Sequence, residues 1–236
     1  MRIRWQGHAC FYVTGNGVCV VTDPYTPQLA GLAPLREPAD VVVTSSDNDA
    51  FHCYAEGVPG NPIVVNALDV ARHGGSQEVN GLRIDAIEAM ESVIHKAHPD
   101  QNAMYRFTVD GVQIGHMGDV GNPLTPAQLD FFRGVDVLLA LTGGPPTIEL
   151  DDLDLAIRQI KPKVVIPMHY QIPNLRLNIL GLEAFTQRYP AALLDLRNEA
   201  TAEFTREQLA AQPAAGPRIV ALQPAAALPQ THPSDW

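Results

Sequence analysis

The stretch Lys161-Pro-Lys-Val-Val-Ile-Pro-Met-His-Tyr170 decides the fold. Its residues from Val164 to Met168 are all apolar and predict a strand, and the continuous apolar run at residues 41–44 predicts another that is buried on both faces. The polar pair His169-Tyr170 follows where the strand over residues 164–168 should end, and functional side chains concentrate in such loops. Before the strand, the apolar spacing of residues 151–160 predicts an amphipathic helix. A helix that leads into a buried strand with a polar end indicates an α/β protein.

The same alternation extends toward the middle of the chain and beyond the deciding stretch. Thr125 is a good helix N-cap, Pro126 suits the first helical position, and Gly134 suits the end of that helix. A buried strand over residues 135–141 follows, and a weaker helix is expected over residues 182–189. This half of the chain therefore alternates helix and strand.

The N-terminal half is richer in short apolar and β-branched runs that turn residues separate. Asn16-Gly17 and Asp110-Gly111 are strong hairpin signals, because both positions of the favoured turn need positive φ angles. Strands are expected over residues 2–5, 10–13, 18–22, 41–44, 63–65, 82–87, 103–109 and 112–116, with a last one at residues 218–222. Two halves of this kind predict two sheets packed together with helices outside.

The composition limits the classes of protein and partner. With 236 residues, 46% of them hydrophobic and 18% charged, the chain can bury a full core. We expect one domain over residues 1–223 and a loose tail rich in Ala and Pro over residues 224–236. The net charge of −10 argues against nucleic acid, whose phosphates need a basic stripe. No run approaches the roughly 18 apolar residues of a membrane span, so the expected partner is a small-molecule substrate.

The N-terminal sequence and the cysteines indicate the compartment. The opening MRIRWQGHACFYV has no continuous apolar segment, so a secretory signal is not expected. Cys10, Cys19 and Cys53 are odd in number and lack C-x-x-C spacing. This pattern favours reduced structural thiols in the cytoplasm, with a reactive thiol as the alternative.

Seven segments of the sequence together indicate a specific family of proteins. They are Trp5–Phe11, Thr22–Pro24, Asp40–Thr44, Gly115–Gly121, Val135–Leu139, Gly143-Gly144 and Lys161–Tyr170. In this order and spacing they resemble the metallo-β-lactamase superfamily, in particular the branch of the ascorbate-6-phosphate lactonase-like hydrolases. The resemblance implies a four-layer αββα sandwich and metal-dependent hydrolysis of a small ester, lactone or phosphorylated metabolite. It leaves homo-oligomerisation open, because no segment identifies an interface.

The resemblance also locates a change in the metal-ligand loop. In the family, the loop after the strand at residues 41–44 carries H-x-H-x-D-H and supplies ligands to two metal ions. Here Ser45, Asp47 and Ala50 replace the three histidines, and only Asp49 remains. The metal-ligand motif is therefore degenerate.

The other family ligands are carried over position by position. The next family histidine aligns with Glu91, although His95 or His98 are alternatives in a loop that is hard to align. The bridging aspartate of the family matches Asp119, and its final histidine matches His169. The resulting expected metal ligands are Asp47, Asp49, Glu91, Asp119 and His169.

Further side chains are implied near these ligands. His8 lies beside the cleft in the resembling family and is the best candidate for a separate catalytic base. Asp119 is expected to act in catalysis as the carboxylate that both metal positions share. Asp23 should lie behind the ligands and orient them, as carboxylates often do. His52 is either a replacement ligand or an ordinary loop residue, and His116 either supports Asp119 or packs in the core.

The altered ligand set changes the chemistry that we expect. Imidazole favours zinc, whereas carboxylate and water favour magnesium or manganese. Two carboxylates about 4 Å apart repel each other by roughly 4 kcal/mol even at an effective dielectric constant of about 20. Four converging carboxylates therefore need a cation or captured protons. A bound divalent cation (manganese, zinc or magnesium) and an empty, partly protonated cleft both remain open.

Two other functions compete with the metal-dependent hydrolase. Ser45 and Ala50 favour a catalytically inactive protein that keeps the fold to bind a ligand or a partner. A metal-free hydrolase could instead use a Ser–His–Asp arrangement that starts from Ser45 or Ser46. The sequence lacks the G-x-S-x-G elbow that often carries such a serine, which disfavours this last alternative.

Overall fold

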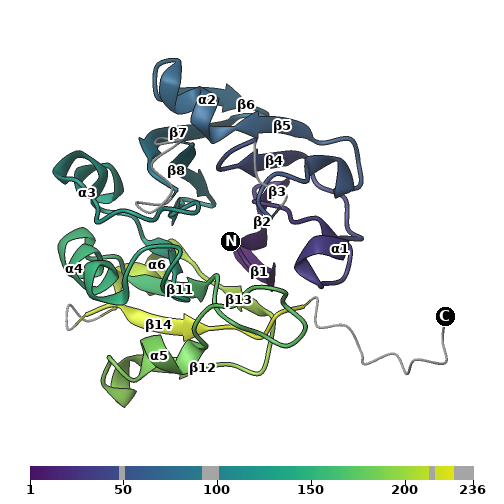
Figure 1. Cartoon of the computed structure of the whole chain (residues 1–236). Helices are drawn as coiled ribbons and strands as arrows, with labels where there is room; N and C mark the ends of the chain where they lie inside the picture. Colours follow the sequence, from purple (N-terminus) through teal and green to yellow (C-terminus); the bar gives the residue numbers. More distant parts are fainter. Residues whose placement is uncertain (48–50, 92–100, 213–215, 226–236) are drawn as a thin grey trace, which may run out of the picture.

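The computed structural model describes residues 1–47, 51–91, 101–212 and 216–225, and their strands form two sheets (Figure 1). In spatial order, the six-stranded sheet contains β13 (Thr201–Glu203), β1 (Arg2–Gly7), β2 (Cys10–Gly15), β3 (Val18–Thr22), β4 (Val41–Thr44) and β5 (Ile63–Asn66). In spatial order, the eight-stranded sheet contains β12 (Leu194–Leu196), β14 (Arg218–Ala221), β11 (Val164–Met168), β10 (Val137–Leu141), β9 (Val112–His116), β8 (Asn102–Val109), β7 (Leu82–Ala89) and β6 (Ser76–Val79).

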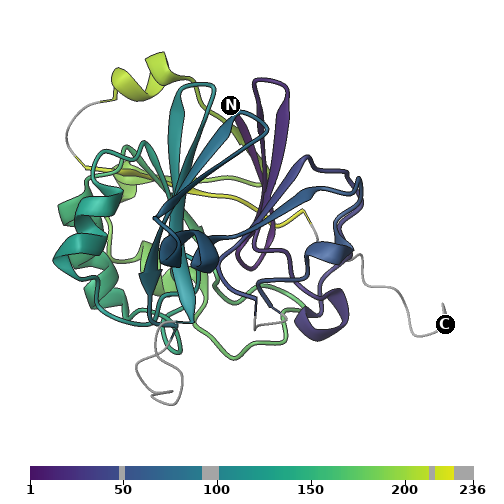
Figure 2. The same ribbon diagram turned by 90° about the horizontal axis from the view of Figure 1, so that it is seen from above.

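Helices lie outside the two sheets. They are α1 (Pro27–Ala30), η1 (Ala55–Gly57), α2 (Ala67–Arg72), α3 (Pro126–Phe132), α4 (Leu150–Ile160), α5 (Leu182–Thr186), η2 (Ala191–Leu193) and α6 (Arg206–Ala210). The helices α3 and α4 pack against each other on one flank of the molecule, and α1 lies on the opposite flank (Figure 1, Figure 2). The four-layer αββα sandwich expected from the sequence is confirmed. None of the described helices is long and apolar enough to cross a membrane.

The two hairpin turns expected from the sequence are present. Asn16 and Gly17 have φ angles of 50° and 73°, and Asp110 and Gly111 have φ angles of 51° and 72°. Positive φ at both central positions is what a type I′ turn requires. The turns join β2 to β3 and β8 to β9, and β2 contacts β8 across the interface between the sheets. Figure 2 shows the two hairpins rising next to each other.

The hydrophobic core lies between the sheets. The strands β4, β10 and β11 are buried at every position, as expected for strands covered on both faces. In β1 the burial alternates, since Ile3 and Trp5 are fully buried while Arg4 is half-buried. The Trp5 ring packs on Phe11 and Tyr170 with centroid distances of 6.3 and 5.0 Å. Aromatic contacts of this kind join the first strands to the end of β11.

Eight elements were not expected from the sequence: α1, η1, α2, η2, α6, β6, β12 and β13. Each has at most six residues. The strands β12 and β13 have three residues each and are only partly buried, so a period of two cannot be recognised in them. They form because β12 pairs with β14 and β13 pairs with β1. This pairing is a tertiary contact, which the local sequence preference for strand does not predict.

The polar strand ends gather at one edge of the sandwich. In one sheet β3, β4 and β5 are parallel neighbours, and in the other β9, β10 and β11 are. Because the carboxyl ends of neighbouring parallel strands meet at the same edge of a sheet, the loops that follow them come together. These loops carry the polar residues that were singled out in the sequence.

Replacing Thr125 by alanine tests how α3 is anchored. Gln128 donates its backbone N–H to Thr125 Oγ1 at 3.4 Å, and Gln128 Oε1 accepts the Thr125 N–H at 2.9 Å. Losing such a cap should lower the free energy of unfolding by about 1 kcal/mol, measured by urea denaturation. Thr125→Ser keeps the hydroxyl and should retain most of the stability. An unchanged midpoint in Thr125→Ala would contradict the anchoring role.

Candidate metal centre

Three buried imidazoles meet at the strand ends. His8 lies in the turn between β1 and β2, His52 in the loop after β4, and His169 directly after β11. One ring nitrogen from each lies within 4.8 Å of the other two. The ring centroids are 4.3 Å apart for His8 and His169, 4.7 Å for His8 and His52, and 5.7 Å for His52 and His169. These three residues are the histidine cluster.

The backbone at the cluster has an unusual conformation. His8, His169 and the nearby Asp23 have φ angles of 53°, 52° and 36°, in a region that residues other than glycine rarely adopt. The His8 carbonyl accepts hydrogen bonds from Trp5 Nε1 at 3.0 Å and from the His169 N–H at 3.1 Å. Such conformations persist where the surrounding contacts fix them, and they concentrate at functional sites.

Asp119 supplies a carboxylate to two of the imidazoles. Its Oδ2 lies 3.4 Å from His52 Nε2, and its Oδ1 lies 3.2 Å from His169 Nε2. The Asp119 N–H donates to Asn102 Oδ1 at 3.0 Å. Gly118 has a φ of 59°, and a Cβ there would lie 2.7 Å from Asn102 Oδ1. A glycine at this position therefore lets the loop pass close to Asn102 and carry Asp119 into the site.

Asp23 fixes His52 from behind. The Asp23 side chain is fully buried. Its Oδ1 accepts hydrogen bonds from the Ser45 N–H at 2.8 Å and from the Tyr105 hydroxyl at 3.1 Å. Its Oδ2 lies 3.2 Å from His52 Nδ1, which leaves His52 Nε2 directed at Asp119. A carboxylate behind an imidazole ligand sets the tautomer and the ring orientation, which is the role that the resemblance implied for Asp23.

The protonation states follow from burial and from these contacts. Burial alone would raise the pKa of the Asp119 carboxyl, but His52 and His169 outweigh it and hold that pKa well below its usual value. Burial alone would lower the pKa of His52, but Asp119 and Asp23 raise it well above its usual value. Burial, and then the neighbouring His169 and His52, lower the pKa of His8 well below its usual value. Without a cation, His52 is therefore an imidazolium and His8 a neutral imidazole.

Polar atoms without partners surround the cluster. Among the described residues, no hydrogen-bond partner exists for either ring nitrogen of His8, for His169 Nδ1 or for Asp119 Oδ1, whose contact with His169 lacks hydrogen-bond geometry. Each buried polar atom left unpaired costs about 1–3 kcal/mol. A divalent cation would give several of these atoms one shared partner.

The arrangement of the imidazoles suits a metal ion. Nitrogen atoms bonded to one tetrahedral zinc ion at about 2.0–2.1 Å lie about 3.4 Å apart. The three ring nitrogens lie within 4.8 Å of one another, so small side-chain rotations that draw them together would let them share one ion. A donor set rich in imidazole favours zinc over magnesium.

The structure brings together three of the residues that the sequence singled out: His8, Asp119 and His169. Asp47 is exposed and does not belong to the ligand cluster found in the described part of the chain. Glu91 is half-buried just beyond β7 and is likewise not a member of that cluster. Within the described residues, imidazoles therefore outnumber carboxylates at this site. Asp49, Ala50, His95 and His98 lie outside the described residues.

His52 is the ligand candidate that the sequence left among several alternatives. The last histidine of the family loop aligns with Ala50, and His52 lies two positions beyond it. This proximity is the only indication that the sequence gives for His52. The structure directs this side chain into the cluster, at 1% exposure. No sequence period indicates which histidine of such a loop faces the cluster.

For Ser45, the serine alternative lacks the contact with a base that it requires. Ser45 is fully buried, and its Oγ has no hydrogen-bond partner in the residues that the structure describes. A serine nucleophile needs a base within hydrogen-bond reach. No such base is seen for Ser45 within the described ranges.

Two facing sheets covered by helices, with imidazoles and a carboxylate at their joined strand ends, place the chain in the class of αββα sandwich proteins. The model of the β-lactamase superfamily domain matches residues 2–169, and the chain belongs to the metallo-β-lactamase superfamily. The UPF0173 metal-dependent hydrolase of Methanoculleus marisnigri is 31% identical over 205 residues, which cover 76% of this chain and 85% of that protein. The corresponding protein of Thermoplasma acidophilum is 30% identical, covering 72% of this chain and 83% of its own length.

A solved structure is similar over nearly the whole chain. It is a Thermotoga maritima protein of the metallo-β-lactamase superfamily that has been proposed to be a Zn-dependent hydrolase. It superposes with a TM-score of 0.72 at 29% sequence identity and covers 94% of this chain and 97% of its own. The likeness therefore extends beyond residue 169, through the last strands of the eight-stranded sheet.

His116 makes the region behind the cluster sensitive to acid. Its Nε2 lies 3.0 Å from the Ala9 carbonyl, and its Nδ1 accepts the Gly118 N–H at 2.9 Å, so the ring is neutral with its proton on Nε2. Asp23 Oδ2 lies 3.9 Å from Nδ1, and the Tyr105 ring stacks on the imidazole. Burial lowers the pKa of His116 below its usual value, although Asp23 opposes the shift.

The unfolded chain takes up a proton at His116 below a pH of about 6.5, whereas the folded chain takes it up only at lower pH. The free energy of unfolding should therefore fall as the pH drops below about 6.5, by up to about 1.4 kcal/mol per pH unit from this group. His116→Gln should show a shallower slope in urea denaturation of the metal-free protein. His52, whose pKa is raised, contributes the opposite slope in both proteins, and this contribution cancels. The exposed His73 provides the control His73→Gln, and equal slopes in wild type and His116→Gln would refute the assignment.

Proposed function

We propose that this chain is a metal-dependent hydrolase whose ion is bound by the histidine cluster together with Asp119. The observation that carries the proposal is the meeting of three buried imidazoles whose ring nitrogens lie within 4.8 Å of one another. The relatives named metal-dependent hydrolases support the activity. Zinc is the preferred ion, because imidazole ligands favour it and because the similar Thermotoga maritima protein has been proposed to depend on zinc.

Each residue of the site has a role that its contacts support. A divalent cation in such a site acts as a Lewis acid on a carbonyl or phosphoryl oxygen and makes water more acidic. His52 and His169 bind the ion, and neutral His8 is their third partner instead of the separate base expected from the sequence. Asp119 stays ionised because its pKa is held low, so it can hold the ion together with the imidazoles and orient water beside it. Asp23 keeps His52 in position.

The substrate class that we propose is a small ester, lactone or phosphorylated metabolite. It rests on the resemblance to the ascorbate-6-phosphate lactonase-like branch. Ser45 Oγ and Asn102 Nδ2 are buried donors without a hydrogen-bond partner among the described atoms. The Ser45 N–H donates a hydrogen bond to Asp23, and Asn102 Oδ1 accepts one from the Asp119 N–H. Both side-chain donors therefore lie close to the histidine cluster and can donate hydrogen bonds to substrate oxygens. We further propose that the protein acts in the cytoplasm, since none of its three cysteines forms a disulfide.

The catalytically inactive alternative is not favoured. It was based on the loss of family histidines at Ser45 and Ala50. His52 restores an imidazole to the site from a neighbouring position, and a decaying site has no reason to keep three buried imidazoles around unpaired atoms.

Metal binding should depend on His52 and His169. Protein purified without chelator should contain a single zinc ion, measured by elemental analysis. In a competition with a chromophoric chelator, His52→Ala and His169→Ala should each raise the Kd for zinc at least tenfold. Even changes behind a ligand cost roughly 10- to 100-fold, and these variants lose the ligand itself. His73→Ala, at an exposed histidine, should bind zinc like the wild type. No metal after incubation with zinc, manganese or magnesium would refute the proposal.

Hydrolysis should require both the ion and Asp119. Zinc-loaded protein should hydrolyse at least one of p-nitrophenyl acetate, p-nitrophenyl phosphate and a γ-lactone, and a chelator should abolish this activity until zinc is restored. Asp119→Asn should lower kcat by about 100-fold or more, the size of a typical proton-transfer contribution. Asp130→Asn changes an exposed carboxylate on α3 and should leave kcat unchanged. Activity that survives chelation would exclude a metal-dependent reaction.

A further inference from the structure

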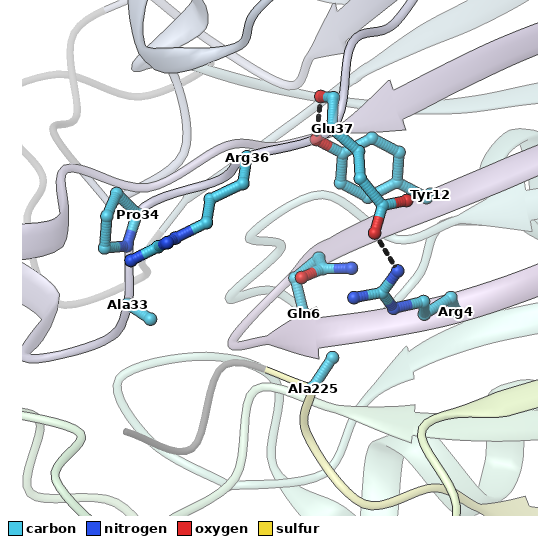
Figure 3. Close-up of a pocket in the computed structure, with 8 residues that line it drawn as sticks. All are labelled: Arg4, Gln6, Tyr12, Ala33, Pro34, Arg36, Glu37 and Ala225. Atoms are coloured by element: carbon cyan, nitrogen blue, oxygen red, sulfur yellow. Dashed lines mark hydrogen bonds and ion pairs between the residues drawn. The ribbon is translucent and has the colours of Figure 1, made fainter. Parts of the chain in front are cut away.

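A pocket lies on the outer face of the six-stranded sheet (Figure 3). Its volume is about 190 Å³. Arg4 and Gln6 of β1 and Tyr12 of β2 line it, on the side of the sheet away from the core that contains Ile3 and Trp5, because side chains alternate along a strand. The pocket shares no lining residue with the histidine cluster. It is therefore a separate feature of the molecule.

The walls of the pocket are held in place by hydrogen bonds. The loop over residues 33–37 forms one wall, and two tyrosines fix its ends. Tyr25 donates its hydroxyl to the Ala33 carbonyl at 2.9 Å, and Tyr12 donates its hydroxyl to the Glu37 carbonyl at 2.6 Å. A backbone hydrogen bond of 2.9 Å to β1 holds the segment at residue 225, which forms another wall. A pocket that is already shaped costs a ligand less ordering free energy.

Gln6 directs an unsatisfied donor into this pocket. The residue is 6% exposed, and its Nε2 has no hydrogen-bond partner in the described ranges of the chain. Figure 3 shows the amide pointing into the space that Arg4 and Arg36 border. A buried amide without a partner costs about 1–3 kcal/mol, which a ligand oxygen would offset.

The charged groups of the pocket favour an anion. Arg4 and Arg36 approach it from opposite sides (Figure 3). Arg4 pairs with Glu37 through one terminal nitrogen, whereas Arg36 forms no ion pair with any described residue. Burial raises the pKa of Tyr12, which stays neutral and has already donated its hydroxyl to Glu37. Two arginines and one glutamate leave the lining positive in a chain of net charge −10.

We propose that this pocket binds the oxyanion group, a carboxylate or a phosphate, of a small molecule. Such a group presents acceptors to Gln6 Nε2 and to the guanidinium N–H groups of Arg4 and Arg36, and hydrogen bonds assisted by charge are strong. Pockets for drug-sized ligands have volumes of about 300–1,000 Å³, so 190 Å³ suits a ligand of few atoms. The proposal does not rest on the hydrolase activity.

Isothermal titration calorimetry of the full-length chain tests the proposal. The protein is first freed of metal by a chelator, so that anions cannot bind to an ion, and is then titrated in Tris chloride with inorganic phosphate and with succinate. At least one of the two should bind saturably to a single site, and the preferred anion identifies the source of the oxyanion. Gln6→Met keeps the side-chain length without the amide, and Arg36→Ala removes the exposed guanidinium. Each substitution should raise the Kd at least tenfold.

The control is Arg158→Ala, which removes an exposed arginine on α4 and should leave the Kd unchanged. The proposal is overturned if neither anion binds, if both pocket variants bind like the wild type, or if Arg158→Ala weakens binding as much as Arg36→Ala. Should Gln6→Met fail to fold, Arg36→Ala decides alone, because Arg36 is exposed. If no anion binds in this metal-free experiment, the hydrolase proposal is unaffected. If the histidine cluster does not bind zinc, the result of the anion titration is unaffected.

Discussion

The buried carboxylate of Asp23 is the contact on which the rest of the site depends. It follows β3 in one sheet, and it accepts hydrogen bonds from the Ser45 N–H after β4 and from the Tyr105 hydroxyl on β8 of the other sheet. An unpaired charge at 0% exposure would be very costly, so these donors and His52 are what allow a carboxylate to lie there. The same contacts join the two sheets at their common edge and aim His52 at Asp119.

A proton and a cation are alternatives in the histidine cluster. His52 lies between Asp23 and Asp119, which outweigh the effect of burial and raise its pKa. Without metal, a proton on His52 balances these carboxylates. A cation at His52 Nε2 would displace that proton, so metal binding and proton release are coupled. Two carboxylates separated by an imidazole thus avoid the repulsion of roughly 4 kcal/mol per close pair that four converging acids would meet.

The sequence predicted those parts of the fold that local rules determine, such as the turn at Asn16-Gly17 and the strands that are apolar throughout. It missed β12 and β13 because strands of three residues form only through their pairing with other strands. In the site, the resemblance pointed to His8, Asp119 and His169, which all follow regular strands. The resemblance did not locate His52 among the metal ligands in the same way. His52 sits in an irregular loop, and its direction depends on a buried carboxylate contributed by another strand end.

One irregularity in β1 supplies a side chain to each face of its sheet. The register with β2 shifts between Trp5 and Gly7, after which Gln6 faces the outer pocket and His8 enters the cluster. Gly7 allows the change of direction because its φ of 116° is rarely adopted by other residues. The His8 carbonyl is held by both Trp5 Nε1 and the His169 N–H. These two hydrogen bonds fix the His8 backbone independently of the Gln6 side chain, although only one residue lies between His8 and Gln6.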